Sequence, residues 1–111
     1  MSETPQAPTP FDHPNVELTQ NGAYRIRLEY PYEHDGQNIA GVVLVRPKAK
    51  HMQAISKVDP EDDAGGQIVT VAQLSGLSPE TVAEMDLVDL VRCAQIGGEM
   101  LGKSIAAGLS A

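Results

Sequence analysis

The sequence contains no tryptophan, one cysteine and only four aromatic residues, three Tyr and one Phe, among 111 positions. The aromatic residues all lie in the first third of the chain, so a hydrophobic core must be built mainly from Val, Leu, Ile and Met. The single cysteine, Cys93, excludes an internal disulfide and fits a reducing compartment. A chain of this length has room for one domain.

Basic residues are also scarce, with 8 Lys and Arg against 15 Asp and Glu and a formal net charge of −7. Nucleic acids and anionic membrane surfaces require clustered cations, and only Arg46, Lys48 and Lys50 lie close together. No apolar run approaches the roughly 18 residues of a membrane span, and the N-terminus does not resemble a signal peptide. We therefore expect a soluble intracellular protein that binds neither nucleic acid nor membrane.

Proline is concentrated at the N-terminus, where Pro5, Pro8, Pro10 and Pro14 accompany few apolar side chains. Such a segment buries too little surface to offset the entropy lost on ordering. The composition predicts a disordered arm over residues 1–21 and a single domain over residues 22–111.

The domain opens with a pattern typical of a β-hairpin over residues 24–46. Apolar and polar side chains alternate from Tyr24 to Tyr30, as in a strand with one exposed face. Pro31 favours an edge position, because proline cannot donate to a ladder. Asp35 and Gly36 mark the turn, although the connection looks longer than two residues. The return strand runs from Ile39 to Arg46.

Helices are predicted over most of residues 48–105. Residues 48–57 suit a short helix with Met52 and Ile55 facing inward. Residues 67–75 fit a buried strand or a helix, and we favour the helix because Gly76 stands at the C-cap position. Ser78, Pro79 and Glu80 form a helix start that leads to about Glu84, and Asp86 is a second N-cap.

The last helix has an apolar face, and its first part, Leu87, Leu90, Val91 and Ala94, is expected to belong to the core. This face consists of Leu87, Leu90, Val91, Ala94, Leu101 and Ile105, and the opposite face of Arg92, Gln95, Glu99 and Lys103. Gly97 and Gly98 predict either a bend or the close approach of another chain segment. The fold class is therefore α+β: an N-terminal β-hairpin followed by three to four short α-helices and preceded by a disordered Pro-rich arm.

One segment, residues 97–104, matches the G-x-x-x-x-G-K-S pattern of a phosphate-binding loop. That loop requires a strand before it and a helix after it, with a further acidic residue downstream for magnesium. Residues before Gly97 have a helical pattern, and only seven residues follow Ser104. We interpret the match as a coincidence.

Other candidate sites fail on their spacing. Asp59, Glu61 and Asp63 resemble the start of a calcium loop, but Ala64 replaces the required glycine and Thr70 the bidentate glutamate. The histidines are His13, His34 and His51, and with Cys93 they have neither metal-ligand spacing nor a nucleophile signature. We expect no catalytic residue, no cofactor and no metal, and hence no enzyme.

The order of the elements resembles a known family. The segments HDGQNIAGVVLVRPKAKHMQAI and VTVAQLSGLSPETVAEMDLVDLVRCAQIGGEML are similar to those of phage tail assembly chaperones from contractile-tailed phages and prophages. The similarity covers about residues 24–105. The matching positions are Asp35, Gly36, Val43, Leu44, Arg46 and Pro47, then Leu74, Gly76, Leu77, Val82, Met85, Asp86, Asp89 and Leu90. The basic Lys48–Lys50 segment and the long arm depart from the family pattern.

This resemblance implies a non-catalytic protein that binds the helical tape measure protein and helps recruit tail-tube subunits during assembly. It implies a location in the host bacterial cytoplasm and absence from the mature virion. Many such phages also produce a form lengthened by a programmed frameshift, which this sequence does not reveal. The alternative is a structural tail component or a generic protein-interaction module retained in the particle. The sequence leaves the oligomeric state open.

Three residues are the candidate partner-binding surface: Met100, Leu101 and Ile105. They follow the two glycines of the last helix, where little of the chain remains for them to pack against. A methionine suits an adaptable binding surface.

Overall fold

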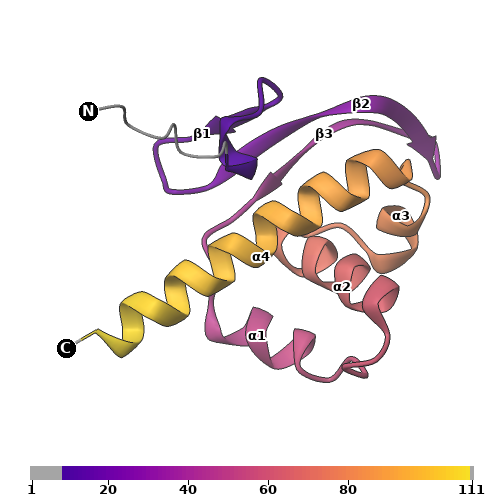
Figure 1. Ribbon diagram of the computed structural model, residues 1–111. Helices are drawn as coiled ribbons and strands as arrows, with labels where there is room; N and C mark the ends of the chain where they lie inside the picture. Colours follow the sequence, from indigo (N-terminus) through magenta and orange to yellow (C-terminus); the bar gives the residue numbers. More distant parts are fainter. Residues whose placement is uncertain (1–8, 111) are drawn as a thin grey trace, which may run out of the picture.

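The computed structural model describes residues 9–110, which form an α+β fold (Figure 1). The elements are η1 (Pro10–Asp12), β1 (Val16–Leu18), β2 (Tyr24–His34), β3 (Gln37–Leu44), α1 (Ala49–Ile55), α2 (Asp63–Ser75), α3 (Pro79–Ala83) and α4 (Leu87–Leu109). The predicted fold class is confirmed. The expected disorder of residues 1–8 lies outside the described residues.

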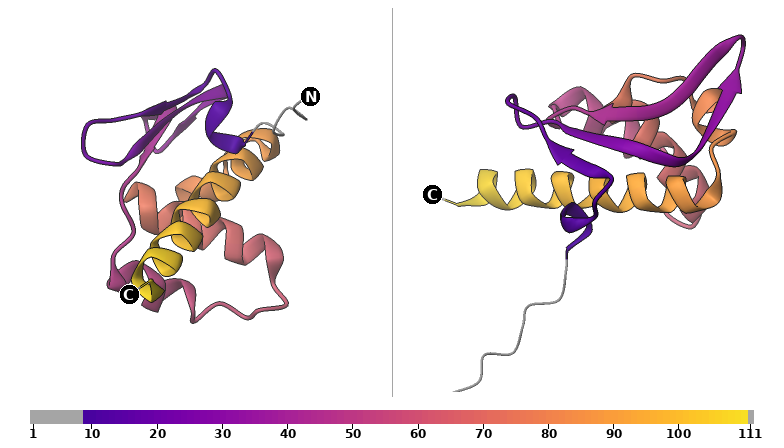
Figure 2. Two further views of the ribbon diagram at one scale, coloured as in Figure 1. Left: turned by 60° about the vertical axis from the view of Figure 1, so that its left-hand side comes forward. Right: turned by 90° about the horizontal axis from the view of Figure 1, so that it is seen from above.

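The three strands form one antiparallel sheet in the order β1-β2-β3. Helices α4 and α2 pack against one face of this sheet, α4 against β2 and α2 against β3, and α1 packs against α2 (Figures 1 and 2). The core lies between the two layers and is almost entirely aliphatic, as the composition predicts. Its fully buried large side chains include Ile26 and Leu44 from the sheet, Leu74 from α2 and Ile96 from α4.

The hairpin prediction is confirmed, and its turn is tighter than expected. His34 pairs with Gln37, so Asp35 and Gly36 alone make the connection. Their φ angles are 51° and 76°, the left-handed conformation that a two-residue hairpin turn requires.

The predicted arm over residues 1–21 is too long, because residues 10–18 belong to the fold. Val16 and Leu18 pair with β2 to make a third strand. Phe11 stacks on Tyr24 with ring centroids 4.6 Å apart, and Lys103 of α4 lies 4.4 Å above the Phe11 ring. Sequence patterns do not reveal a strand of three residues, since it is too short to show periodicity.

The predicted helices are present, with two corrections to their boundaries and faces. In α1, His51 is buried in place of Met52, and its Nδ1 accepts the Lys48 backbone N–H at 2.9 Å. Burial and the neighbouring lysines lower the pKa of His51, which favours the neutral ring that this bond needs. Helix α2 begins at Asp63, earlier than expected, after Asp62 caps its N-terminus.

The caps that the sequence predicts are confirmed. Gly76 ends α2 with φ 78°, and the Ser78 side chain accepts the Thr81 backbone N–H to start α3. Asp86 accepts the Val88 backbone N–H and starts α4. Helix α4 is 23 residues long and continues without interruption through Gly97 and Gly98. Its last turns extend beyond the other elements (Figure 2).

Candidate protein-binding face

The buried face of α4 overlaps only partly with the one that the sequence suggested: Leu90 is buried and Ala94 packs against the core, as predicted. Its buried residues are Asp89, Leu90, Cys93, Ile96, Gly97 and Met100. Leu87 and Val91, predicted to be core residues, are instead 69% and 47% exposed. The prediction is wrong because α4 carries two apolar lines about 120° apart, and residue periodicity does not show which of them packs against the sheet.

The second line, which we call the α4 stripe, runs along the more exposed side of the helix, where Ala94 and Leu101 are partly buried. It consists of Leu87, Val91, Ala94, Gly98, Leu101 and Ile105. Their spacing alternates between four and three residues, which is the heptad pattern of helices that pack against another helix. The stripe spans about 28 Å at the rise of an α-helix. Ile105 is 48% exposed.

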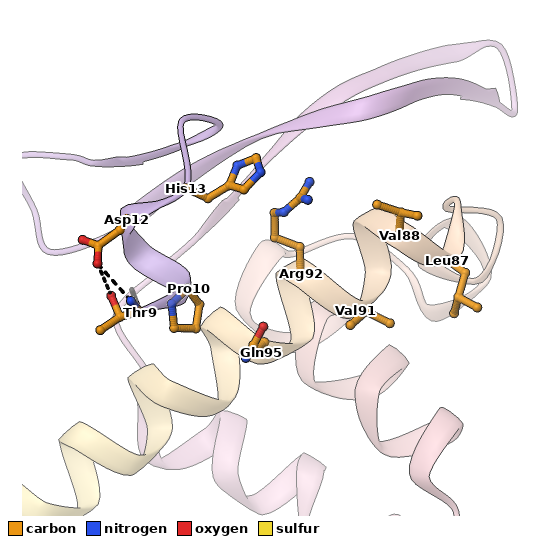
Figure 3. Close-up of a pocket in the computed structure, with 9 residues that line it drawn as sticks. All are labelled: Thr9, Pro10, Asp12, His13, Leu87, Val88, Val91, Arg92 and Gln95. Carbon is orange, nitrogen blue, oxygen red and sulfur yellow. Dashed lines mark hydrogen bonds between the residues drawn. The ribbon is translucent and has the colours of Figure 1, made fainter. Parts of the chain in front are cut away.

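Three hollows flank the stripe. The largest, about 730 Å³, lies between η1 and the first turns of α4. Pro10 and His13 line it on one side and Val88 and Val91 on the other (Figure 3). The second, about 390 Å³, lies beside Ala94 and Gly98. In the third, about 180 Å³, Met52 lies with Leu101 and Ile105. The stripe and these hollows form one face that can receive side chains from a partner.

The sequence-predicted binding residues divide between this face and the core. Leu101 and Ile105 line the third hollow together, whereas Met100 is buried against the core at 6% exposure. The prediction did not place Leu87 and Val91 on this face, because it assigned them to the core, whereas the structure leaves them exposed. The heptad spacing of Leu87 and Val91 with the other stripe residues is the sequence pattern that could have placed them on this face.

Asp89 fixes α4, and with it the stripe, under the sheet. The β2–β3 ladder is interrupted between the pairs Arg27–Gly41 and Tyr32–Ile39, which leaves a bulge in β2. The buried Asp89 carboxylate accepts the backbone N–H of Glu29 at 2.8 Å and that of Tyr30 at 3.0 Å. A single carboxylate thus accepts two backbone N–H groups in the interrupted part of the ladder.

Two neighbours of this bulge complete the arrangement. Pro31 lies inside the bulge, beyond the part of β2 that pairs with β1. At this position β2 is locally an edge strand, as predicted, and no ladder N–H is needed. Arg92 Nη1 lies 3.2 Å from the Glu29 carboxylate and 3.9 Å from that of Asp89. The Asp89 charge is therefore both hydrogen-bonded and paired, as a buried charge must be.

Tyr32 provides a second attachment, at the end of the hairpin. Its hydroxyl donates to the Thr81 carbonyl of α3. Burial and the nearby Cys93 and Glu84 raise the pKa of Tyr32, so the hydroxyl remains a donor. Together Asp89 and Tyr32 hold the long hairpin against α3 and α4.

Cys93 is fully buried in the core, where a free cysteine packs as a small apolar residue. Burial and the Asp89 charge raise the pKa of the thiol to about 12, although Arg92 opposes the shift. Because only the thiolate is nucleophilic, we expect iodoacetamide at pH 8 to leave the folded protein unmodified while a urea-unfolded sample reacts fully. Mass spectrometry measures the fraction of Cys93 alkylated in each sample. Comparable alkylation of both samples would contradict the burial of this residue.

The remaining motifs are accounted for by the fold. Residues 97–104 lie inside α4, so the segment that matches a phosphate-binding loop is helical. Within residues 9–110, no group of three or more His, Cys, Asp or Glu side chains is placed to hold a metal ion. Over the same range, none of the helices has the length and apolar character needed to cross a membrane.

The fold and this face together define a small α+β protein that presents an apolar helical surface suited to contacts with other proteins. The chain matches, over residues 25–102, the sequence profile of a family described as "Phage tail assembly chaperone proteins, E, or 41 or 14". It belongs to this family, as the sequence resemblance predicted. Neither a curated protein nor a solved structure matches it.

Proposed function

We propose that the chain is a non-catalytic chaperone that binds the tape measure protein along the α4 stripe and helps recruit tail-tube subunits. It acts in the cytoplasm of the host bacterium and is absent from the mature virion. The observation that carries this proposal is the heptad line of apolar residues on α4, of which the fold leaves Leu87, Val91 and Ile105 exposed and Ala94 and Leu101 partly exposed.

The chemistry of the stripe suits a helical partner. A tape measure protein is long and helical, and its apolar stripes need covering until the tail tube forms around it. Two helices with matching heptad lines pack side by side, and the small Ala94 and Gly98 allow a close approach at the centre. The net charge of −7 favours solubility of the resulting complex.

Co-expression with the tape measure protein encoded nearby tests the proposal. We expect the wild-type chain to keep the tape measure protein soluble and to co-purify with it. Val91→Asp, which places a charge in the exposed stripe, should abolish co-purification because a buried unpaired carboxylate opposes binding. Ala107→Asp adds the same charge to the same helix at an exposed position off the stripe and is the matched control.

Two results would contradict the proposal. One is a tape measure protein that stays insoluble with the wild-type chain, and the other is equal co-purification by Val91→Asp. Detection of the chain in purified virions at the level of a structural subunit would contradict its absence from the particle.

A further inference from the structure

We propose that the α4 stripe fixes the direction of the helix it binds, with the basic end of that helix at Leu87 and its acidic end at Ile105. This inference rests on the proposed function and adds the charge order of the bound segment. It follows from the charges that border the stripe, which change sign along α4.

The border is acidic at the Leu87 end. Asp86 caps α4 immediately before Leu87, and Asp12 lines the hollow that Leu87 shares with η1. Arg92 lines the same hollow, but it lies within 4 Å of the carboxylates of Glu29 and Asp89. Its charge is therefore already compensated.

The acidic border continues to the middle of the stripe. Asp59, Asp62 and Asp63 line the hollow beside Ala94 and Gly98. Asp59 and Asp62 accept backbone N–H groups of Glu61 and Gly65, and no Lys, Arg or His within residues 9–110 forms an ion pair with any of the three. Their negative charge is not neutralised by the chain itself.

The charge that borders the stripe changes from negative to positive beyond Glu99. No acidic residue follows in the described part of α4, and Lys48 lines the hollow with Leu101 and Ile105. Lys50 lies in the first turn of α1, which begins beside the same hollow. Lys103 lies over Phe11, to one side of the stripe. The Ile105 end is therefore the basic end of an acidic protein.

A helix with one basic and one acidic half fits this border in one direction only. Such surface ion pairs are individually weak, but several of them together amount to about a tenfold difference in affinity. A helix with acidic residues near its N-terminus and basic residues near its C-terminus, the order favoured by the helix dipole, would lie antiparallel to α4.

Three designed peptides of about 20 residues, long enough to cover the stripe, test the inference. All carry the same leucine heptads and the same numbers of Glu and Lys. One has an acidic N-terminal half and a basic C-terminal half, the second has the reverse order, and the third alternates the two charges. Fluorescence anisotropy should show the alternating peptide binding about tenfold more weakly than either segregated peptide.

A nitroxide on the acidic end of each segregated peptide then reports direction. We expect it to broaden amide signals around Ile105 for both peptides, whichever terminus is acidic. Lys48→Glu should weaken binding of the segregated peptides about threefold, whereas Lys57→Glu, an equal charge change on a residue that lines none of the three hollows, should not.

Equal affinity for all three peptides, or broadening at both ends of the stripe, would overturn the inference while leaving tape measure binding intact. Failure of every peptide to bind, with normal co-purification of the tape measure protein, would also overturn it. Sedimentation showing a dimer that Ile105→Asp dissociates and Ala107→Asp does not would assign the stripe to a second copy of the chain instead.

Discussion

Replacing Asp89 with alanine is expected to destabilise the fold by about 3 kcal/mol or more, because it removes the acceptor of two buried backbone N–H groups. It also leaves Arg92 with only the half-exposed Glu29 carboxylate as a partner. Loss of one member of a buried ionic arrangement costs on this scale. The free energy of unfolding in urea measures the effect, and hydrogen exchange at Glu29 and Tyr30 should accelerate more than at Val42 in the regular ladder.

The matched control is Asp86→Ala. Asp86 is also an aspartate of α4 that accepts a backbone N–H, but it is exposed and accepts only that of Val88. We expect Asp86→Ala to lower the free energy of unfolding by about 1 kcal/mol, the usual contribution of an N-cap side chain. Equal losses for the two variants would show that the Asp89 carboxylate does not hold the bulge.

Asp89 also shows where sequence patterns stop being informative. It is one of the positions that match the family pattern, yet in the sequence it resembles any solvent-exposed acid near a helix start. Its role depends on Glu29 and Tyr30, which lie about 60 residues away in β2. Only the tertiary structure brings the carboxylate to the two free N–H groups.

Local features were far more predictable than the packing. The turn at Asp35 and Gly36, the caps at Ser78 and Asp86 and the left-handed Gly76 follow from the preferences of single residues. The preferences of single residues do not decide whether Leu87 or Cys93 faces the sheet, because both lie on apolar lines of α4. Of the three residues predicted to bind a partner, Leu101 and Ile105 lie in the α4 stripe and Met100 lies in the core. The prediction did not include Leu87 and Val91, which the structure leaves exposed.

The paired glycines of α4 should respond to substitution with opposite signs. A Cβ atom on Gly97 would lie 3.1 Å from Cγ2 of Thr70 and 3.3 Å from Cδ1 of Leu74, so α2 packs directly against this position. A side chain as large as leucine cannot fit there without moving α2 away from α4. We expect Gly97→Leu to destabilise the fold by about 3 kcal/mol in urea unfolding, the upper part of the range for overpacked cores.

Gly98, one residue further, has no atom within 4 Å of an added Cβ. Gly98→Ala should therefore stabilise α4 by about 1 kcal/mol, because alanine loses less backbone entropy than glycine in a helix. The same methyl group would lie in the α4 stripe, where it moves a partner helix outward. A variant that unfolds at higher urea yet binds the tape measure protein more weakly would show that Gly98 serves the partner's approach. Unchanged binding would mean that the helices do not meet closely at this position.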